Sequence, residues 1–139
     1  MKIIFLCVAN SARSQLAEGL AKFLLIEKAQ IQSAGSIPSG VVHPWAIQSL
    51  MEIGIDIHQN SSKSFHQIPQ AFLSDLDFVI TLCAEEVCPV MITKAKRIHW
   101  PIQDPAHASK DQIPEAFRSA RDEIRKKLLA FGKEHHLLK

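Results

Sequence analysis

The feature that most constrains this chain lies at its start, where an apolar run leads through a short loop into a helical pattern. Residues 3–6 are all apolar and predict a buried strand. Cys7 follows at the strand end, and five residues separate it from Arg13. Residues 14–27 then carry apolar side chains at helical spacing. A buried strand joined this closely to a helix is typical of a parallel sheet covered by helices.

The same alternation of strands and helices continues to the end of the chain. Hydrophobic periodicity predicts three further strands, over residues 31–34, 78–82 and 96–100. It predicts three further helices, over residues 44–54, 67–73 and 113–131. We therefore expect residues 1–139 to form one α/β domain of three layers, a four-stranded parallel sheet flanked by helices on both faces.

This arrangement predicts where the side chains of two elements lie. On the first helix, Leu16, Leu20, Phe23 and Leu24 are expected on one buried side. In a parallel sheet, ligands bind where the carboxyl ends of the strands meet. Cys7 and Cys83 both end predicted strands, so both should open onto the same edge of the sheet.

Composition excludes several classes of protein. The chain has 47% hydrophobic and 22% charged residues, as ordinary soluble domains do. A net charge of +2 gives no argument for a nucleic-acid or membrane partner. No apolar run is long enough to span a bilayer, and the N-terminal run is too short for a signal peptide. We expect a cytoplasmic monomer without a cofactor or metal, in which three cysteines are catalytic or redox thiols.

Cys7 and Arg13 together suggest chemistry at an oxyanion. Loop amides, a cation and a helix N-terminus all favour a thiolate, the nucleophilic form of cysteine. The guanidinium of Arg13 matches two oxygens of a tetrahedral anion, and Ser14 can cap the helix and bond the thiolate. A buried cysteine beside a solvated arginine is the alternative. The residues expected to bind the oxyanion are Val8, Ala9, Asn10, Ser11, Ala12, Arg13 and Ser14.

The stretch CVANSARS resembles the C-x5-R-S anion loop of low-molecular-weight tyrosine phosphatases and the arsenate reductases related to them. Four further motifs extend the resemblance over nearly the whole chain: SQLAEG at 14–19, SAG at 33–35, HP at 43–44 and DP at 104–105. The phosphatases typically have Pro after the Arg-Ser pair and aromatic residues after Asp-Pro. Here Gln15 and Ala106 stand at those places, which is similar to the reductases.

The stretch TLCAEEVCP at 81–89 is similar to the cysteine pair of thioredoxin-coupled arsenate reductases. The resemblance implies that Cys7 attacks arsenate, Cys83 then attacks Cys7 as arsenite leaves, and Cys88 finally attacks Cys83. Two alternatives remain for the pair, a buried core position or half of a zinc site completed by His99 or His107.

Helix geometry constrains the segment between the two cysteines. A regular helix would place the Cα atoms of Cys83 and Cys88 about 8–9 Å apart, from about 1.5 Å rise per residue. A disulfide needs Cα atoms within about 7 Å. We therefore predict that this segment is looped or unwinds on oxidation, in line with Pro89 after it.

The resemblance also implies roles around the loop. Asp104 is the general acid for the departing oxygen, although an Asp-Pro turn without a catalytic role is the alternative. Asn10 is expected in a left-handed conformation, which Asn tolerates. Some relatives bind a monovalent cation with positions matching Asn10, Glu18 and Ser33 and an acidic residue. Lys63 stands at the acidic place, so we predict little potassium dependence.

The sequence therefore predicts an arsenate reductase that also accepts phosphate or sulfate as oxyanion analogues. The expected reductant is thioredoxin, with glutaredoxin or glutathione as the alternative. One competing interpretation is a tyrosine phosphatase with a Cys7 phospho-enzyme intermediate. Another is a redox or anion-binding module without catalysis.

Overall fold

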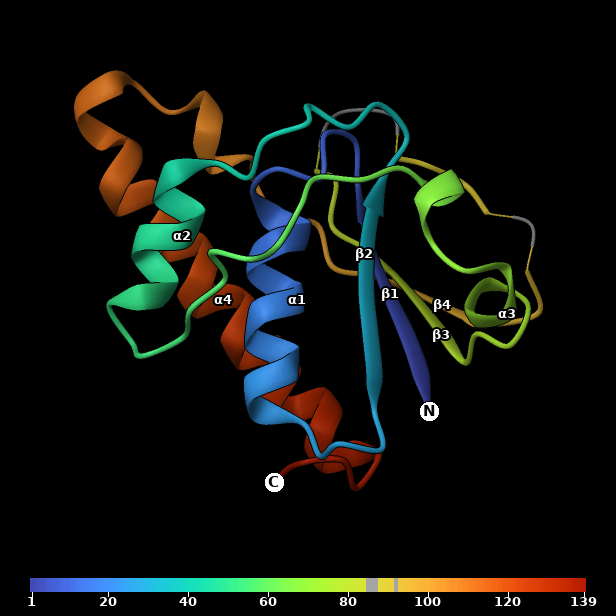
Figure 1. Cartoon of the computed structure of the whole chain (residues 1–139). Coiled ribbons are helices and arrows are strands. Elements are labelled where there is room, and N and C mark those ends of the chain that lie inside the picture. The colour runs from blue at the N-terminus through green and yellow to red at the C-terminus, as the bar shows by residue number, and fades with distance from the viewer. Residues whose placement is uncertain (85–87, 92) are drawn as a thin grey trace.

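The computed structural model describes residues 1–84, 88–91 and 93–139. Its centre is a parallel sheet with the strand order β2-β1-β3-β4 (Figure 1). The strands are β1 (Lys2–Cys7), β2 (Gln30–Gly35), β3 (Phe78–Thr81) and β4 (Lys96–His99). The predicted α/β class and the four parallel strands are confirmed, and each strand end agrees with the sequence pattern to within one residue.

The register of the sheet places the strand that carries Cys7 in its middle. Strand β1 pairs with β2 on one side and β3 on the other, with Cys7 opposite Gly35 and Leu6 opposite Thr81. The side chains of residues 3–6 have no exposed surface. An uninterrupted apolar run is what a strand needs when both faces of a parallel sheet are covered.

Helices cover both faces of the sheet, as predicted (Figure 1). The four helices are α1 (Arg13–Leu24), α2 (Pro44–Met51), α3 (Gln70–Leu73) and α4 (Ile113–Glu134). Helices α1, α2 and α4 share one apolar cluster with Phe5 and Ile80 of the sheet. Helix α3 and the 3-10 turn Phe65–Gln67 lie over the other face, against Ile4 and Leu6.

Helix α1 is shorter than its hydrophobic pattern predicts. Leu25 is extended, and the backbone N–H of Ile26 donates to the carbonyl of Leu137 at 2.8 Å. The chain after Leu24 therefore pairs with the C-terminal segment instead of continuing the helix. The placement of Phe23 on the buried side is wrong, because its side chain is 53% exposed.

The other differences from the predicted helices have local causes. The helix expected over residues 67–73 is a 3-10 turn and then α3, because Ile68 is extended before Pro69. Helix α2 ends at Met51, and Gly54 with φ +83° completes the turn after it. In the part of the chain that the structure describes, no helix is both long and apolar enough to cross a membrane.

Candidate active site

The loop after β1 turns its carbonyl groups away from its own centre. The carbonyl of Val8 accepts from the Ile37 N–H, that of Ala9 from the Ser39 N–H and that of Ser11 from the His43 N–H, each at 3.0 Å. In a trans peptide the following N–H points opposite to the carbonyl. Because neighbouring segments bind these carbonyls, the N–H groups of Ala9, Asn10 and Ala12 point the opposite way, as an anion site in the loop requires.

Asn10 holds this loop in shape. Its φ of +48° confirms the predicted left-handed conformation. Its amide nitrogen donates to the hydroxyls of Ser14 at 2.8 Å and Ser33 at 3.0 Å, and its amide oxygen accepts from the backbone N–H of Lys63 at 2.8 Å. One buried side chain therefore connects the loop to α1, to β2 and to the 60–64 segment.

Cys7 lies at the bottom of the loop with a free, buried thiol. Its sulfur is 2.9 Å from the hydroxyl of Ser14, so the predicted contact between these side chains is present. The expected capping role of Ser14 is wrong. Ala12 is the N-cap and the Ser14 side chain is inside the first turn of α1. The hydroxyl thus serves the sulfur instead of the helix end.

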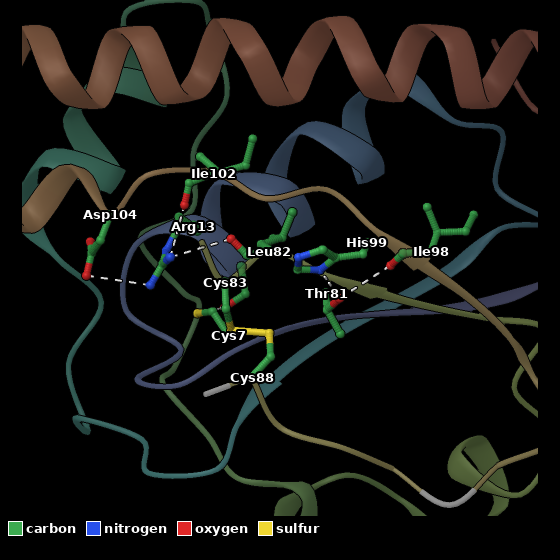
Figure 2. The surroundings of a disulfide bond; sticks show 11 residues. Cys7, Arg13, Thr81, Leu82, Cys83, Cys88, Ile98, His99, Ile102 and Asp104 are labelled. Carbon is green, nitrogen blue, oxygen red and sulfur yellow. Dashed lines mark hydrogen bonds and ion pairs between the residues drawn. A yellow bond between two sulfur atoms is a disulfide. The ribbon is translucent and has the colours of Figure 1, made fainter. Parts of the chain in front are cut away.

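Arg13 is anchored by two carbonyls from distant parts of the chain. One guanidinium nitrogen, Nη1, donates to the carbonyl of Ile102 at 3.0 Å and to that of Leu82 at 3.5 Å (Figure 2). The other, Nη2, lies 3.6 Å from Oδ2 of Asp104. These contacts fix the direction of a guanidinium that is only 5% exposed.

Asp104 stands at the N-cap of the 3-10 turn Pro105–His107. Its Oδ1 accepts from the backbone N–H of Ala106 at 3.0 Å. A cavity of about 390 Å³ lies between this turn and α4 and reaches Asp104. His43 is close enough for the charge of this carboxylate to affect its pKa. Burial lowers the pKa of His43, and the charge of Asp104 opposes that shift.

Cys83 and Cys88 form a disulfide beside this site (Figure 2). Their Cα atoms are 5.5 Å apart, which fits a disulfide and not the ends of a regular helical segment. Cys83, Ala84 and Cys88 are non-helical, in agreement with the prediction of a looped segment. Residues 85–87, on which the rest of that prediction falls, lie outside the described residues.

The sheet brings the disulfide to the end of the strand that carries Cys7. Leu82 extends the pairing of β3, because its N–H donates to the carbonyl of Leu6 at 3.0 Å. Cys83 is the next residue, so Cys7 and Cys83 leave neighbouring strands at the same edge, as predicted. Figure 2 shows both side chains at this edge, with the bridge continuing to Cys88.

The histidines weighed as zinc ligands have other neighbours. His99 Nδ1 lies 2.6 Å from the Thr81 hydroxyl, and His107 Nε2 lies 3.6 Å from Asp104. Among residues 1–84, 88–91 and 93–139, no group of three or more His, Cys, Asp or Glu side chains is arranged to hold a metal ion.

Behind the loop, the buried carboxylate of Glu18 collects several donors. The Ser33 hydroxyl donates to it at 2.6 Å, and the ammonium groups of Lys63 and Lys22 lie 3.4 and 3.1 Å away. Asn60 donates to it as well, at 3.0 Å. Lys63 thus brings a positive charge to Glu18 and Ser33, two of the positions at which some relatives are expected to bind a monovalent cation.

We compared the chain with known proteins because the anion loop, the anchored Arg13 and the neighbouring Asp104 form a candidate active site. A model of the family described as low molecular weight phosphotyrosine protein phosphatase matches residues 2–136. The chain belongs to this family. It is 41% identical over 134 residues to an arsenate reductase of Halalkalibacterium halodurans, and the match covers 94% of each chain.

Solved structures of the same family agree with this assignment. An arsenate reductase in the phosphate binding state has a TM-score of 0.78 and 33% identity, with 96% of this chain and 97% of that chain covered. A thioredoxin-dependent arsenate reductase of Corynebacterium glutamicum has a TM-score of 0.68 and 26% identity. That match covers 96% of this chain and 62% of the other.

Some residues of the site could not be found from this family member's sequence. The carbonyls of Leu82 and Ile102 that anchor Arg13 leave no signal, because every residue has a carbonyl. Gln15 appears in the sequence only as a difference between branches. In the structure its buried amide donates to Asn10 Oδ1 at 3.1 Å and to the Ser61 carbonyl at 3.0 Å. The available signal was a polar glutamine in the first turn of the predicted helix, directly after the Arg13-Ser14 pair of the anion loop.

Proposed function

We propose that this protein reduces arsenate to arsenite by a relay of three thiols, Cys7, Cys83 and Cys88. The observation that supports this most is the Cys83–Cys88 disulfide at the sheet edge where Cys7 keeps a free thiol. That is the distribution of sulfur bonds that the relay would reach at its end. The 41% identity to an arsenate reductase agrees with it.

The first step takes place in the anion loop. Arsenate binds to the converging amides of residues 8–14 and to Arg13. The thiolate of Cys7 attacks arsenic, forming an S–As bond, and one oxygen leaves as water. Asp104 donates the proton to that oxygen, acting as the general acid. The fixed guanidinium and amides stabilise the charge that develops on the remaining oxygens.

The next two steps are thiol–disulfide chemistry. The thiolate of Cys83 attacks the sulfur of Cys7, the S–As bond breaks, and its electron pair stays on arsenic, which leaves as arsenite. Cys7 and Cys83 are then joined by a disulfide. The thiolate of Cys88 attacks Cys83 and releases Cys7 as a thiolate, leaving the Cys83–Cys88 bond. Arsenic gains two electrons, and two thiols are oxidised.

A reductant must then reopen the Cys83–Cys88 disulfide. We propose thioredoxin for this role, and a thioredoxin-dependent relative of similar fold supports the choice. Cys83 is 1% exposed, whereas Cys88 is only partly buried, so an external thiolate reaches Cys88 more easily. Glutaredoxin or glutathione is the alternative reductant.

The test is arsenate-dependent NADPH oxidation with thioredoxin and thioredoxin reductase. Serine at position 7, 83 or 88 should abolish multiple turnover, because each thiol is needed once in every cycle. Replacing thioredoxin with glutathione and glutaredoxin in the same assay identifies the reductant. Continued turnover of Cys83→Ser would exclude the relay.

A second candidate is a protein-tyrosine phosphatase with a Cys7 phospho-enzyme intermediate. It is favoured by a specific observation, namely that the loop, Arg13 and Asp104 are assembled while Cys83 and Cys88 are bridged. This activity predicts that Cys83→Ser and Cys88→Ser hydrolyse a phosphotyrosine peptide as the wild type does. Cys7→Ser should be inactive in that assay.

The expectations of one domain over residues 1–139, a monomer, a cytoplasmic location and no nucleic-acid or membrane partner stay predictions. One continuous sheet with apolar clusters on both faces supports the single domain. Size-exclusion chromatography with light scattering would test the monomer.

A further inference from the structure

In the carboxyl group of Asp104, one oxygen accepts a backbone hydrogen bond and the other faces the side chains of Arg13 and His107. Oδ1 accepts from the Ala106 N–H at 3.0 Å as the cap of the turn Pro105–His107. Pro105 is buried, which keeps this turn in place. Oδ2 is therefore the oxygen that carries the proton when Asp104 acts as an acid.

Two nitrogen-bearing side chains, a guanidinium and an imidazole, face Oδ2 at equal distance. Nη2 of Arg13 and Nε2 of His107 are each 3.6 Å from it. A guanidinium keeps its protons at every physiological pH, whereas an imidazole gains and loses one near neutrality. His107 is thus the neighbour of the two that can exchange a proton with Oδ2. At 3.6 Å the contact is an ion-pair distance, and a hydrogen bond requires the two atoms to approach to about 3.2 Å or less.

The chemistry of the first step creates a need for such a neighbour. A carboxyl group is ordinarily ionised at neutral pH, yet a general acid must hold a proton when the oxygen leaves. A carboxylate and an imidazole in contact can share one proton, which belongs to the pair. The proton can then rest on nitrogen and be used through Oδ2.

His107 is far more open to solvent than the half-buried acid that it faces. Its side chain is 80% exposed, whereas that of Asp104 is 20% exposed. Both line the cavity of about 390 Å³, together with Ser119 and Glu123 of α4. The carboxylate of Glu123 adds a negative charge to the lining of the cavity. His43, the N-cap residue of α2, also interacts with the charge of Asp104.

We propose that His107 is a positioning residue that supplies Asp104 with its proton in every turnover. This rests on the proposed function, in which Asp104 is the acid of the first step. Asp104 Oδ2 gives its proton to the oxygen leaving arsenic. The Nε2–H bond of His107 breaks as an O–H bond forms on Oδ2, and His107 takes a proton back from water. No electrons move in this transfer.

The test is a single turnover of fully reduced protein with excess arsenate, in which no reductant is needed. The loss of two thiols per protein molecule measures the rate of the reaction. His107→Ala should slow this reaction about tenfold at pH 7, with an unchanged arsenate concentration for half of the maximal rate. That is less than the 10²- to 10⁴-fold typical of the group that transfers the proton itself. The dependence of the rate on pH should differ from that of the wild type, and added imidazole should restore the rate.

Three further variants separate proton transfer from a structural role. His58→Ala is the matched control, because His58 is exposed and lies 3.2 Å from Asp56 but stands outside the site; it should react as the wild type does. His107→Gln keeps a polar side chain that neither gains nor loses a proton near neutral pH, and should be as slow as His107→Ala. Adding His107→Ala to Asp104→Asn should cause no further loss, because both act on one proton.

The outcomes are distinct. A wild-type rate and pH profile in His107→Ala, or full activity in His107→Gln, would overturn the role of His107 while leaving the proposed function intact. Unchanged activity of Asp104→Asn would overturn both the role of His107 and the assignment of Asp104 as the acid, while the relay of three thiols would stand. If reduced wild-type protein loses no thiols to arsenate, the proposed function fails and this inference fails with it.

Discussion

At the scale of single residues, Lys63 carries the clearest consequence. Its ammonium lies 3.4 Å from the Glu18 carboxylate, and the two side chains are 14% and 3% exposed. Its backbone N–H also donates to Asn10 Oδ1. The lysine thus places a fixed positive charge directly behind the anion loop, and this position agrees with the prediction that no potassium ion is needed there.

Lys63→Ala should lower the free energy of unfolding by about 1–2 kcal/mol in choline chloride. This is less than the 3–5 kcal/mol for a fully broken buried pair, because Lys22 still faces Glu18. In potassium chloride of equal ionic strength, Lys63→Ala should regain part of the lost free energy of unfolding. The stability of the wild type should be the same in both salts. Urea unfolding in the two salts measures this.

Lys22→Ala is the matched control, since Lys22 faces the same carboxylate with a 53% exposed side chain. Its loss should be below about 1 kcal/mol and independent of the salt. A potassium-dependent wild-type stability or reduction rate would contradict the assignment of Lys63.

At the scale of elements, the contact between β2 and the anion loop leaves no room for a side chain. A Cβ atom at Gly35 would lie 3.0 Å from the backbone nitrogen of Asn10 and still closer to the carbonyl oxygen of Val8. These are backbone atoms, so they can give way only if the loop moves. Gly35 is therefore required by close packing of two elements, and not by its own dihedral angles.

Gly35→Ala should weaken phosphate binding at least tenfold, because the displaced loop no longer directs its amides at one point. Overpacking should also cost about 1–3 kcal/mol of stability. Protection of Cys7 from iodoacetamide by increasing phosphate measures the affinity on the reduced protein, and urea unfolding measures the stability.

Gly132→Ala is the control for crowding alone. A Cβ atom there would lie 2.9 Å from Leu138 Cγ, at the end of α4 away from the loop. It should lose stability and keep the wild-type phosphate affinity. Wild-type affinity in Gly35→Ala would show that the loop tolerates the displacement.

At the scale of the whole molecule, His43 ties together elements that are far apart in the chain. Its backbone N–H donates to the loop carbonyl of Ser11, and its Nδ1 accepts from the Trp45 N–H at the start of α2. Its ring stacks on Phe117 of α4 with centroids 4.6 Å apart. The anion loop, α2 and α4 therefore meet at one histidine.

The pKa of His43 is lowered from 6.5, mainly by burial, and this has a consequence for stability. Between 6.5 and the lower native value, the unfolded chain binds a proton that the native chain does not. Stability therefore falls as the pH is lowered through this range, and the contribution levels off below the native pKa.

His43→Asn keeps a side chain that can cap α2 and removes the titration. Its loss of stability relative to the wild type should therefore be smaller at pH 5.5 than at pH 7.5. Urea midpoints of both proteins at the two pH values measure this difference, because other titrating groups affect both alike. A larger loss at pH 5.5 would contradict the sign.

Local spacing made much of this protein predictable. A buried strand, Cys7, five residues and Arg13 define the loop through chain geometry alone, and the left-handed Asn10 follows from what that residue tolerates. Parallel strands place their ends at one edge, which puts Cys83 near Cys7. The end of α1 was not predictable in this way, because a distant segment decides it: Ile26, after Leu25, pairs with the C-terminal segment.

The sequence by itself determined the fold class and the placing of Cys7 and Cys83 at strand ends on one edge of the sheet, because these depend on periodicity and short-range spacing. The tertiary structure alone decided that Arg13 is anchored on the carbonyls of Leu82 and Ile102, and that Asp104 Oδ2 lies between Arg13 and His107. Such contacts join residues up to 91 positions apart, as Arg13 and Asp104 are. They arise when the layers pack, so no local pattern records them.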